Sequence, residues 1–90
     1  MKRPISTIRI SRVFEKNFER LPKRIQVLAE KKGFLFRGNA FHPSLRLHRL
    51  SGRLDGHWSI SVDRRYRIMF IPVENGDVLF VSIGTHAIYD

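Results

Sequence analysis

Residues 58–83 decide the fold and read WSISVDRRYRIMFIPVENGDVLFVSI. Apolar and polar residues alternate over 58–62, which is the period of a half-buried strand. Two further apolar runs follow at 66–71 and 78–83, and Asn75-Gly76 between them tolerates the positive φ that a type I′ turn requires. The stretch therefore predicts an antiparallel meander in which the last strand is central or near-central.

The residues before this meander predict a strand, two helices and one more strand. Period-two alternation over 5–10 indicates the first strand. Ser11 can cap a helix whose apolar residues recur at helical spacing, and Pro22 suits the first turn of a second helix. Turn residues over 38–43 end the helical half, and alternation over 45–50 predicts a strand before the meander.

This order is an α+β plan. Ninety residues are enough for one two-layer core, and the chain has no repeat or linker, so we expect a single domain over 1–90. The helices should pack on one face of a twisted, mainly antiparallel sheet. The other, uncovered face should present a set of polar side chains together: Arg46, His48, Ser59, Ser61 and Arg67.

The charge balance favours a polyanionic partner. Lys and Arg number 17 against 8 Asp and Glu, a net charge of +9, which makes nucleic acid the default partner. In the meander half every Lys or Arg is an arginine, and guanidinium groups bind phosphate in a bidentate way. Cysteine is absent, which excludes disulfides, thiolate nucleophiles and cysteine-based metal sites. No apolar segment has the length of a signal core or a membrane span, so we expect a cytoplasmic protein without a membrane partner.

The four histidines differ in what they predict. None has the helical spacing or the acidic neighbour of a metal ligand, so we expect no metal and no cofactor. His42 and His57 are expected to be structural or exposed residues and not catalytic ones. His48 alternates with apolar neighbours and should share a face with Arg67, whereas His86 follows a buried strand, where a rigid scaffold can hold a functional side chain.

Five segments together resemble the RelE/ParE toxin superfamily of type II toxin–antitoxin systems, in particular its YafQ-like and RelE-like branches. The resemblance covers nearly the whole chain. The segments are His42-Pro43-Ser44-Leu45, Leu50-Ser51-Gly52, residues 56–62, residues 66–70 and Ile83-Gly84-Thr85-His86. The resemblance implies a RelE-like fold and a cytoplasmic endoribonuclease, or mRNA interferase, that cuts mRNA in the ribosomal A site. It also implies a cognate antitoxin as partner, with DNA contacted only through the antitoxin complex.

The resemblance also implies site residues. Arg67, in Tyr-Arg-Ile, matches the arginine that stabilises the transition state. His86 matches the C-terminal catalytic histidine, His48 the upstream histidine, and Tyr89 the C-terminal aromatic residue. The chain departs from the family on the third strand, where Ser59 and Ser61 stand in place of the lysines of RelE. It also departs before the fourth strand, where Arg65 stands in place of an acidic residue of YafQ-like toxins and Asp63 lies two residues earlier.

Metal-independent cleavage of RNA uses the 2′-hydroxyl as nucleophile, which requires a base, a stabiliser of the phosphorane and an acid. Arg67 is the predicted stabiliser and His86 the predicted acid, while either His48 or Asp63 acts as base or orients the hydroxyl. The predicted RNA contacts are Arg46, Arg64, Arg65 and Tyr89.

Two other functions are compatible with the sequence: a ParE-type gyrase inhibitor, which lacks the ribonuclease residues, and a non-catalytic RNA- or ribosome-binding module. Single residues also have structural alternatives. Arg67 can pair with the carboxylate of Asp63 or Glu74, Tyr89 can pack the terminus against the sheet, and Trp58 is expected in the core.

Overall fold

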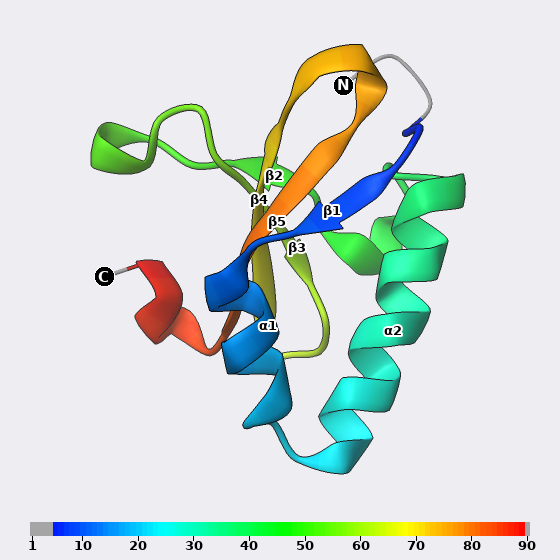
Figure 1. Cartoon of the computed structure of the whole chain (residues 1–90), viewed down its shortest axis with the longest axis vertical. Coiled ribbons are helices and arrows are strands. Elements are labelled where there is room, and N and C mark those ends of the chain that lie inside the picture. Colours follow the sequence, from blue (N-terminus) through cyan, green and yellow to red (C-terminus); the bar gives the residue numbers. More distant parts are fainter. Residues whose placement is uncertain (1–4, 90) are drawn as a thin grey trace.

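The computed structural model describes residues 5–89 as two helices packed on a five-stranded sheet of order β1-β5-β4-β3-β2 (Figure 1). The strands are β1 (Ile8–Ile10), β2 (His48–Arg49), β3 (Trp58–Ser61), β4 (Arg67–Pro72) and β5 (Val78–Gly84), and the helices are α1 (Arg12–Glu19) and α2 (Lys23–Gly38). β1 runs parallel to β5, and the other neighbouring strands are antiparallel. The predicted α+β architecture is confirmed, with β5 next to the central strand. Within residues 5–89, neither α-helix combines the length and the apolar character that crossing a membrane requires.

Helix α1 begins at the predicted cap. The Oγ of Ser11 accepts a hydrogen bond from the N–H of Phe14 at 2.9 Å and donates one to the carbonyl of Val81 at 2.7 Å. Val81 is the extra residue of a bulge, because the β4–β5 register shifts between Met69 and Phe70. One hydroxyl therefore caps the helix and also satisfies a carbonyl of the bulged strand.

The core is a cluster of phenylalanines between the helices and the sheet. Phe36 of α2 is fully buried, with ring centroids 4.8 Å from Phe70 and 5.8 Å from Phe80. Phe14 of α1 lies 5.4 Å from Phe80. The sequence does not determine where the second helix ends, because Gly33 could have ended it. In the structure α2 continues through Gly33, since Phe36 beyond it is anchored in this core.

Two predicted strand boundaries are wrong. The first strand begins at Ile8 instead of residue 5, and Ile10 is half exposed at the edge of the sheet. The predicted strand over 45–50 is reduced to β2. Leu45 belongs instead to the turn η1 (Pro43–Leu45) and is completely buried, and Arg46 has a left-handed backbone, with φ of 48°.

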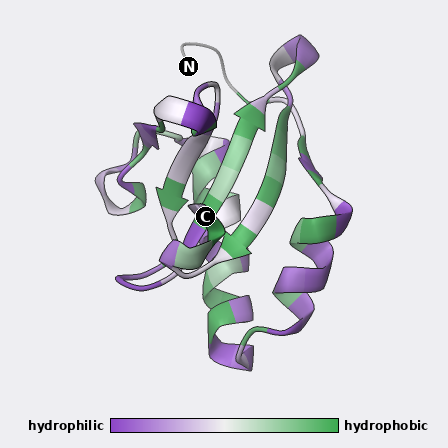
Figure 2. Ribbon diagram, turned by 90° about the vertical axis from the view of Figure 1, so that its left-hand side faces the viewer, coloured by the Kyte–Doolittle hydropathy of each residue, from purple (hydrophilic) through white to green (hydrophobic). Residues whose placement is uncertain are grey.

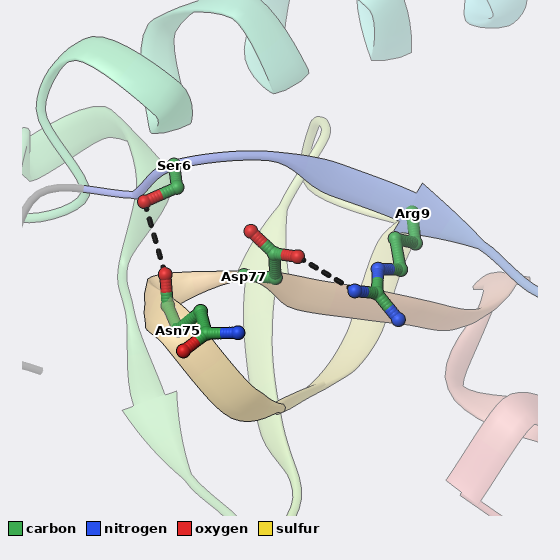
Figure 3. A network of polar contacts seen from close by, with 4 residues as sticks. All are labelled: Ser6, Arg9, Asn75 and Asp77. Carbon is green, nitrogen blue, oxygen red and sulfur yellow. Dashed lines mark hydrogen bonds and ion pairs between the residues drawn. The ribbon is translucent and has the colours of Figure 1, made fainter.

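The edge strand β1 is tied to the β4–β5 hairpin (Figure 3). Ser6 donates its hydroxyl to the carbonyl of Asn75 at 3.1 Å, and Arg9 forms an ion pair with Asp77 at 2.8 Å. Asn75 and Gly76 both have positive φ, of 62° and 80°, which confirms the predicted turn. The ion pair is half exposed on the arginine side, so its main role is to fix the register of a short edge strand.

Candidate functional site

The sheet face opposite the helices carries two rows of aligned side chains. Cα pairing places one row across β2, β3, β4 and β5: His48, Ser59, Met69 and Ser82. A second row crosses β3, β4 and β5: Ser61, Arg67 and Gly84. The prediction that His48, Ser59, Ser61 and Arg67 share this face is confirmed. The sequence predicts that Arg46 lies on this face as part of a strand. Arg46 lies instead before β2, at the end of the turn η1, with a left-handed backbone.

The C-terminal turn η4 (His86–Tyr89) covers this face and lies in front of the strands in Figure 2. The hydroxyls of Tyr89 and Ser59 are hydrogen-bonded at 2.5 Å, and the Nη2 of Arg53 donates to the carbonyl of Tyr89 at 3.1 Å. A Cβ on Gly84 would stand 2.7 Å from the Cγ2 of Ile88, so only glycine lets the turn come this close. We call these contacts the C-terminal clamp.

The clamp overturns the prediction that the second face is uncovered. Ser59, Ser61, Ser82 and Met69 are all buried, with Ser59 at 0% exposure. Sequence reasoning missed Ser82, whose buried Oγ has no partner among residues 5–89. The structure favours the alternative for Tyr89, in which the side chain packs the terminus against the sheet.

The clamp also determines where His86 lies. The imidazole is exposed and meets the Tyr89 ring edge-on, with centroids 5.2 Å apart. Gly84 is the Cα partner of Arg67, and His86 follows it by two residues. Arg67 and His86 are thus at the same end of the sheet. Tyr89 holds the turn that carries His86 against the sheet face through its hydrogen bond to Ser59.

Arg67 is half-buried and is held by main-chain oxygens. Its Nη1 donates to the carbonyl of Asp63 at 2.5 Å and to the carbonyl of Tyr66 at 3.1 Å. The structure shows this arrangement instead of the alternative pairing with the carboxylate of Asp63 or Glu74. Within residues 5–89, the Nη2 and Nε of Arg67 have no hydrogen-bond partner. The guanidinium is therefore fixed on one side and keeps donors for an anion on the other.

Asp63 closes the β3–β4 turn. Its Oδ1 accepts hydrogen bonds from the N–H of Arg65 at 2.8 Å and of Tyr66 at 2.7 Å. Burial raises the pKa of Asp63, but these two hydrogen bonds and the positive charges of Arg24 and Arg67 outweigh it and lower the pKa below 3.8. A carboxylate stabilised in this way is a weak proton acceptor.

His48 has a defined tautomer. Its Nδ1 lies 3.0 Å from the carbonyl oxygen of Arg46, and because a carbonyl can only accept, Nδ1 carries the proton. When the ring is neutral, Nε2 therefore carries the lone pair, and the side chain is exposed. Nε2 is thus the atom of His48 that could act as a general base.

The other two histidines have different surroundings. The Nδ1 of His42 accepts from the N–H of Ser44 at 3.2 Å and caps η1, as a structural residue would. The Nδ1 of His57 is buried without a partner in the described part of the chain. Across residues 5–89, no three His, Asp or Glu side chains gather where they could share a metal ion. Trp58 packs against the core, as predicted, and the guanidinium of Arg49 lies 5.6 Å from its ring centroid.

The clamp leads to a first prediction. Replacing Ser59 with Ala leaves the phenol of Tyr89 without its partner, and Tyr89→Phe removes the other half of the same bond. We expect each change to lower the free energy of unfolding by about 1 kcal/mol, and the double variant to cost little more than either single one. Urea unfolding measures these costs, and the NMR shift of the His86 ring protons reports whether the Tyr89 ring has moved. Additive costs with an unmoved His86 signal would show that the two hydroxyls act independently.

Comparison with known proteins identifies the fold. No protein-family model matches the chain, and no curated protein sequence matches it significantly. Among solved structures, YafQ from E. coli strain BL21(DE3) superposes with a TM-score of 0.75 at 19% identity, over 91% of this chain and 94% of YafQ. A YoeB/ParE toxin from Agrobacterium tumefaciens gives 0.76 at 14% identity, over 90% and 99% of the two chains. The RelBE2 toxin–antitoxin complex from Mycobacterium tuberculosis gives 0.74 at 18% identity, over 89% and 96%. The chain therefore has the fold of the RelE/ParE toxin superfamily, in the form shared by YafQ, YoeB and RelE-type toxins.

Proposed function

We propose that this protein is the toxin of a type II toxin–antitoxin pair and that it cuts mRNA on the ribosome. The observation that carries the proposal is the arrangement of Arg67, His48 and His86 on a RelE-like sheet. Arg67 is a braced guanidinium with donors to spare, His48 is an imidazole whose Nδ1 faces a carbonyl so that Nε2 is the nitrogen left to accept a proton, and His86 is an exposed imidazole at the same end of the sheet. These are the three kinds of group that phosphodiester cleavage by a 2′-hydroxyl requires.

The reaction is a transphosphorylation that needs no metal. The Nε2 of His48 removes the proton of the 2′-hydroxyl, and the resulting oxygen attacks the neighbouring phosphorus. Arg67 donates hydrogen bonds to the phosphorane oxygens as their negative charge grows. The bond from phosphorus to the 5′-oxygen breaks, and that oxygen takes a proton from the imidazolium of His86. The products are a 2′,3′-cyclic phosphate and a free 5′-hydroxyl.

This assignment chooses between the two candidate bases. His48 is favoured because its Nε2 is free, whereas Asp63 spends its Oδ1 on the turn and has a lowered pKa. Asp63 instead supports Arg67, since its carbonyl accepts from the guanidinium. A chain without His48 can still bind RNA, but it lacks this route for the first proton transfer.

The proposed protein partner is an antitoxin, a short acidic protein with an amphipathic helix. Two of the structures that share this fold are toxin–antitoxin complexes, DinJ–YafQ and RelBE2. The net charge of +9 favours an acidic partner as well as RNA. The proposed site of action is the cytoplasm, where both mRNA and ribosomes are found.

Mapping of transcript ends tests the proposal directly. We expect purified protein, added to ribosomes translating a defined message, to produce new 5′ ends inside codons, and we expect addition of an antitoxin encoded beside this gene to suppress them. The same message without ribosomes shows whether cleavage depends on translation. Intact message together with inhibited DNA gyrase would contradict the proposal and support the ParE-type alternative, and ribosome binding without cleavage would support the non-catalytic one.

A further inference from the structure

A second polar feature lies at the edge of the sheet, beside the β3–β4 turn. It is a groove of about 530 Å³ between α2, η1 and the end of β3, which we call the α2–β3 groove. The polar and charged residues along it are Lys32, Ser44, Arg46, Ser61, Asp63 and Arg64. Strand β2 pairs with β3 only at Trp58 and Ser59, so it leaves this part of the β3 edge open.

The charged residues of the groove are mostly cations. Lys32, Arg46 and Arg64 line it against the single carboxylate of Asp63. Among residues 5–89, none of these three cations forms an ion pair with a carboxylate, and the Nζ of Lys32 is oriented by a hydrogen bond to the Oγ of Ser44 at 3.2 Å. Unpaired guanidinium groups beside hydroxyls are the donors that bind phosphate oxygens.

The groove continues from the row that contains Arg67. Ser61 lines the groove and is the Cα partner of Arg67 on the neighbouring strand. Asp63 lines it as well, and its carbonyl accepts the hydrogen bond of the Arg67 guanidinium. A strand of RNA with one phosphate at Arg67 therefore has a cationic path directly beside it.

We propose that the α2–β3 groove binds the phosphodiester that flanks the scissile one in single-stranded RNA, with Lys32 as a contact that the sequence did not suggest. The inference rests on the proposed function, because it takes Arg67 as the site of the scissile phosphate. An RNA strand fits better than an acidic peptide because the three cations line one groove, and two other residues of that groove, Ser61 and Asp63, adjoin Arg67. Arg46 lines the groove from a left-handed backbone, a conformation that costs energy in a residue other than glycine.

Binding of a non-cleavable RNA separates this inference from the cleavage reaction. The probe is a short single-stranded RNA with 2′-O-methyl groups, titrated into the intact protein and followed by fluorescence anisotropy at several salt concentrations. We expect Lys32→Gln and Arg64→Gln each to weaken binding and to reduce the salt slope of log Kd by about 0.7, the value for one phosphate contact on a single strand. The matched control is Lys31→Gln, which removes the same charge from an exposed position of α2 outside the groove.

The outcomes are distinct. Equal effects of Lys32→Gln and Lys31→Gln would overturn the inference, since net charge alone would then explain binding. Unchanged RNA binding in the Lys32 and Arg64 variants, with weaker binding of an acidic peptide, would assign the groove to a protein partner and also overturn it. RNA binding in the groove by a protein that cuts no message would support the inference and contradict the proposed function.

Discussion

Replacing Arg67 with Ala is expected to lower the rate of mRNA cleavage by about 100- to 1,000-fold, the usual cost of one well-placed donor to a developing anion. The reason is that Arg67 is braced before any substrate arrives. Its Nη1 is held by the carbonyls of Asp63 and Tyr66, so the guanidinium needs little reorganisation when the phosphorane forms. Single-turnover cleavage of a ribosome-bound message measures the effect without a contribution from product release.

Arg67→Lys is the informative companion to this variant. Lysine keeps the charge but lacks the planar fork, and with two of its three N–H donors on the carbonyls it has one left for the phosphate, so we expect it to recover only a small part of the rate. Thermal unfolding of both variants controls for the lost main-chain hydrogen bonds. Full activity of a folded Arg67→Ala protein would remove Arg67 from the site and, with it, the proposed chemistry.

Much of the fold follows from patterns that act over short distances. Alternation over 58–62 predicts which residues of β3 face the core, and Asn75-Gly76 predicts its turn because both residues tolerate positive φ. Ser11 predicts the start of α1 because its hydroxyl can accept a hydrogen bond from an N–H of the first helical turn. The strand over 45–50 fails because alternation cannot reveal that Arg46 adopts a left-handed backbone, which breaks the strand and lets Leu45 enter the core from a turn.

The candidate site is predictable to the extent that strand register determines it. His48, Ser61 and Arg67 share a face because side chains of paired residues point the same way, and this parity can be read from the sequence. The clamp over that face cannot be read in this way. It depends on a hydrogen bond between Ser59 and Tyr89, 30 residues apart, and on the absence of a Cβ at Gly84. Local patterns contain no information about either contact.

His48→Gln is expected to lower the cleavage rate by about 100- to 10,000-fold, the range for loss of a positioned general base, while Asp63→Asn changes it only a few-fold. Asparagine keeps an oxygen that can accept the two N–H bonds of the turn, so Asp63→Asn removes the charge with little change in geometry. The comparison therefore tests which of the two residues takes the proton from the 2′-hydroxyl. Rates for both variants are measured under single-turnover conditions.

The dependence of the cleavage rate on pH tests independently which residue is the base. The pKa of Asp63 is lowered, and this determines the direction in which Asp63 would shift the acidic limb of the profile. A depressed pKa keeps Asp63 ionised to a lower pH than an ordinary aspartate, so with Asp63 as the base the rate would be lost only as the pH falls through that lowered pKa. With His48 as the base, we expect the acidic limb of the profile to persist in Asp63→Asn and to disappear in His48→Gln. A limb that disappears in Asp63→Asn instead would transfer the role of base to the carboxylate and leave His48 to orient the hydroxyl.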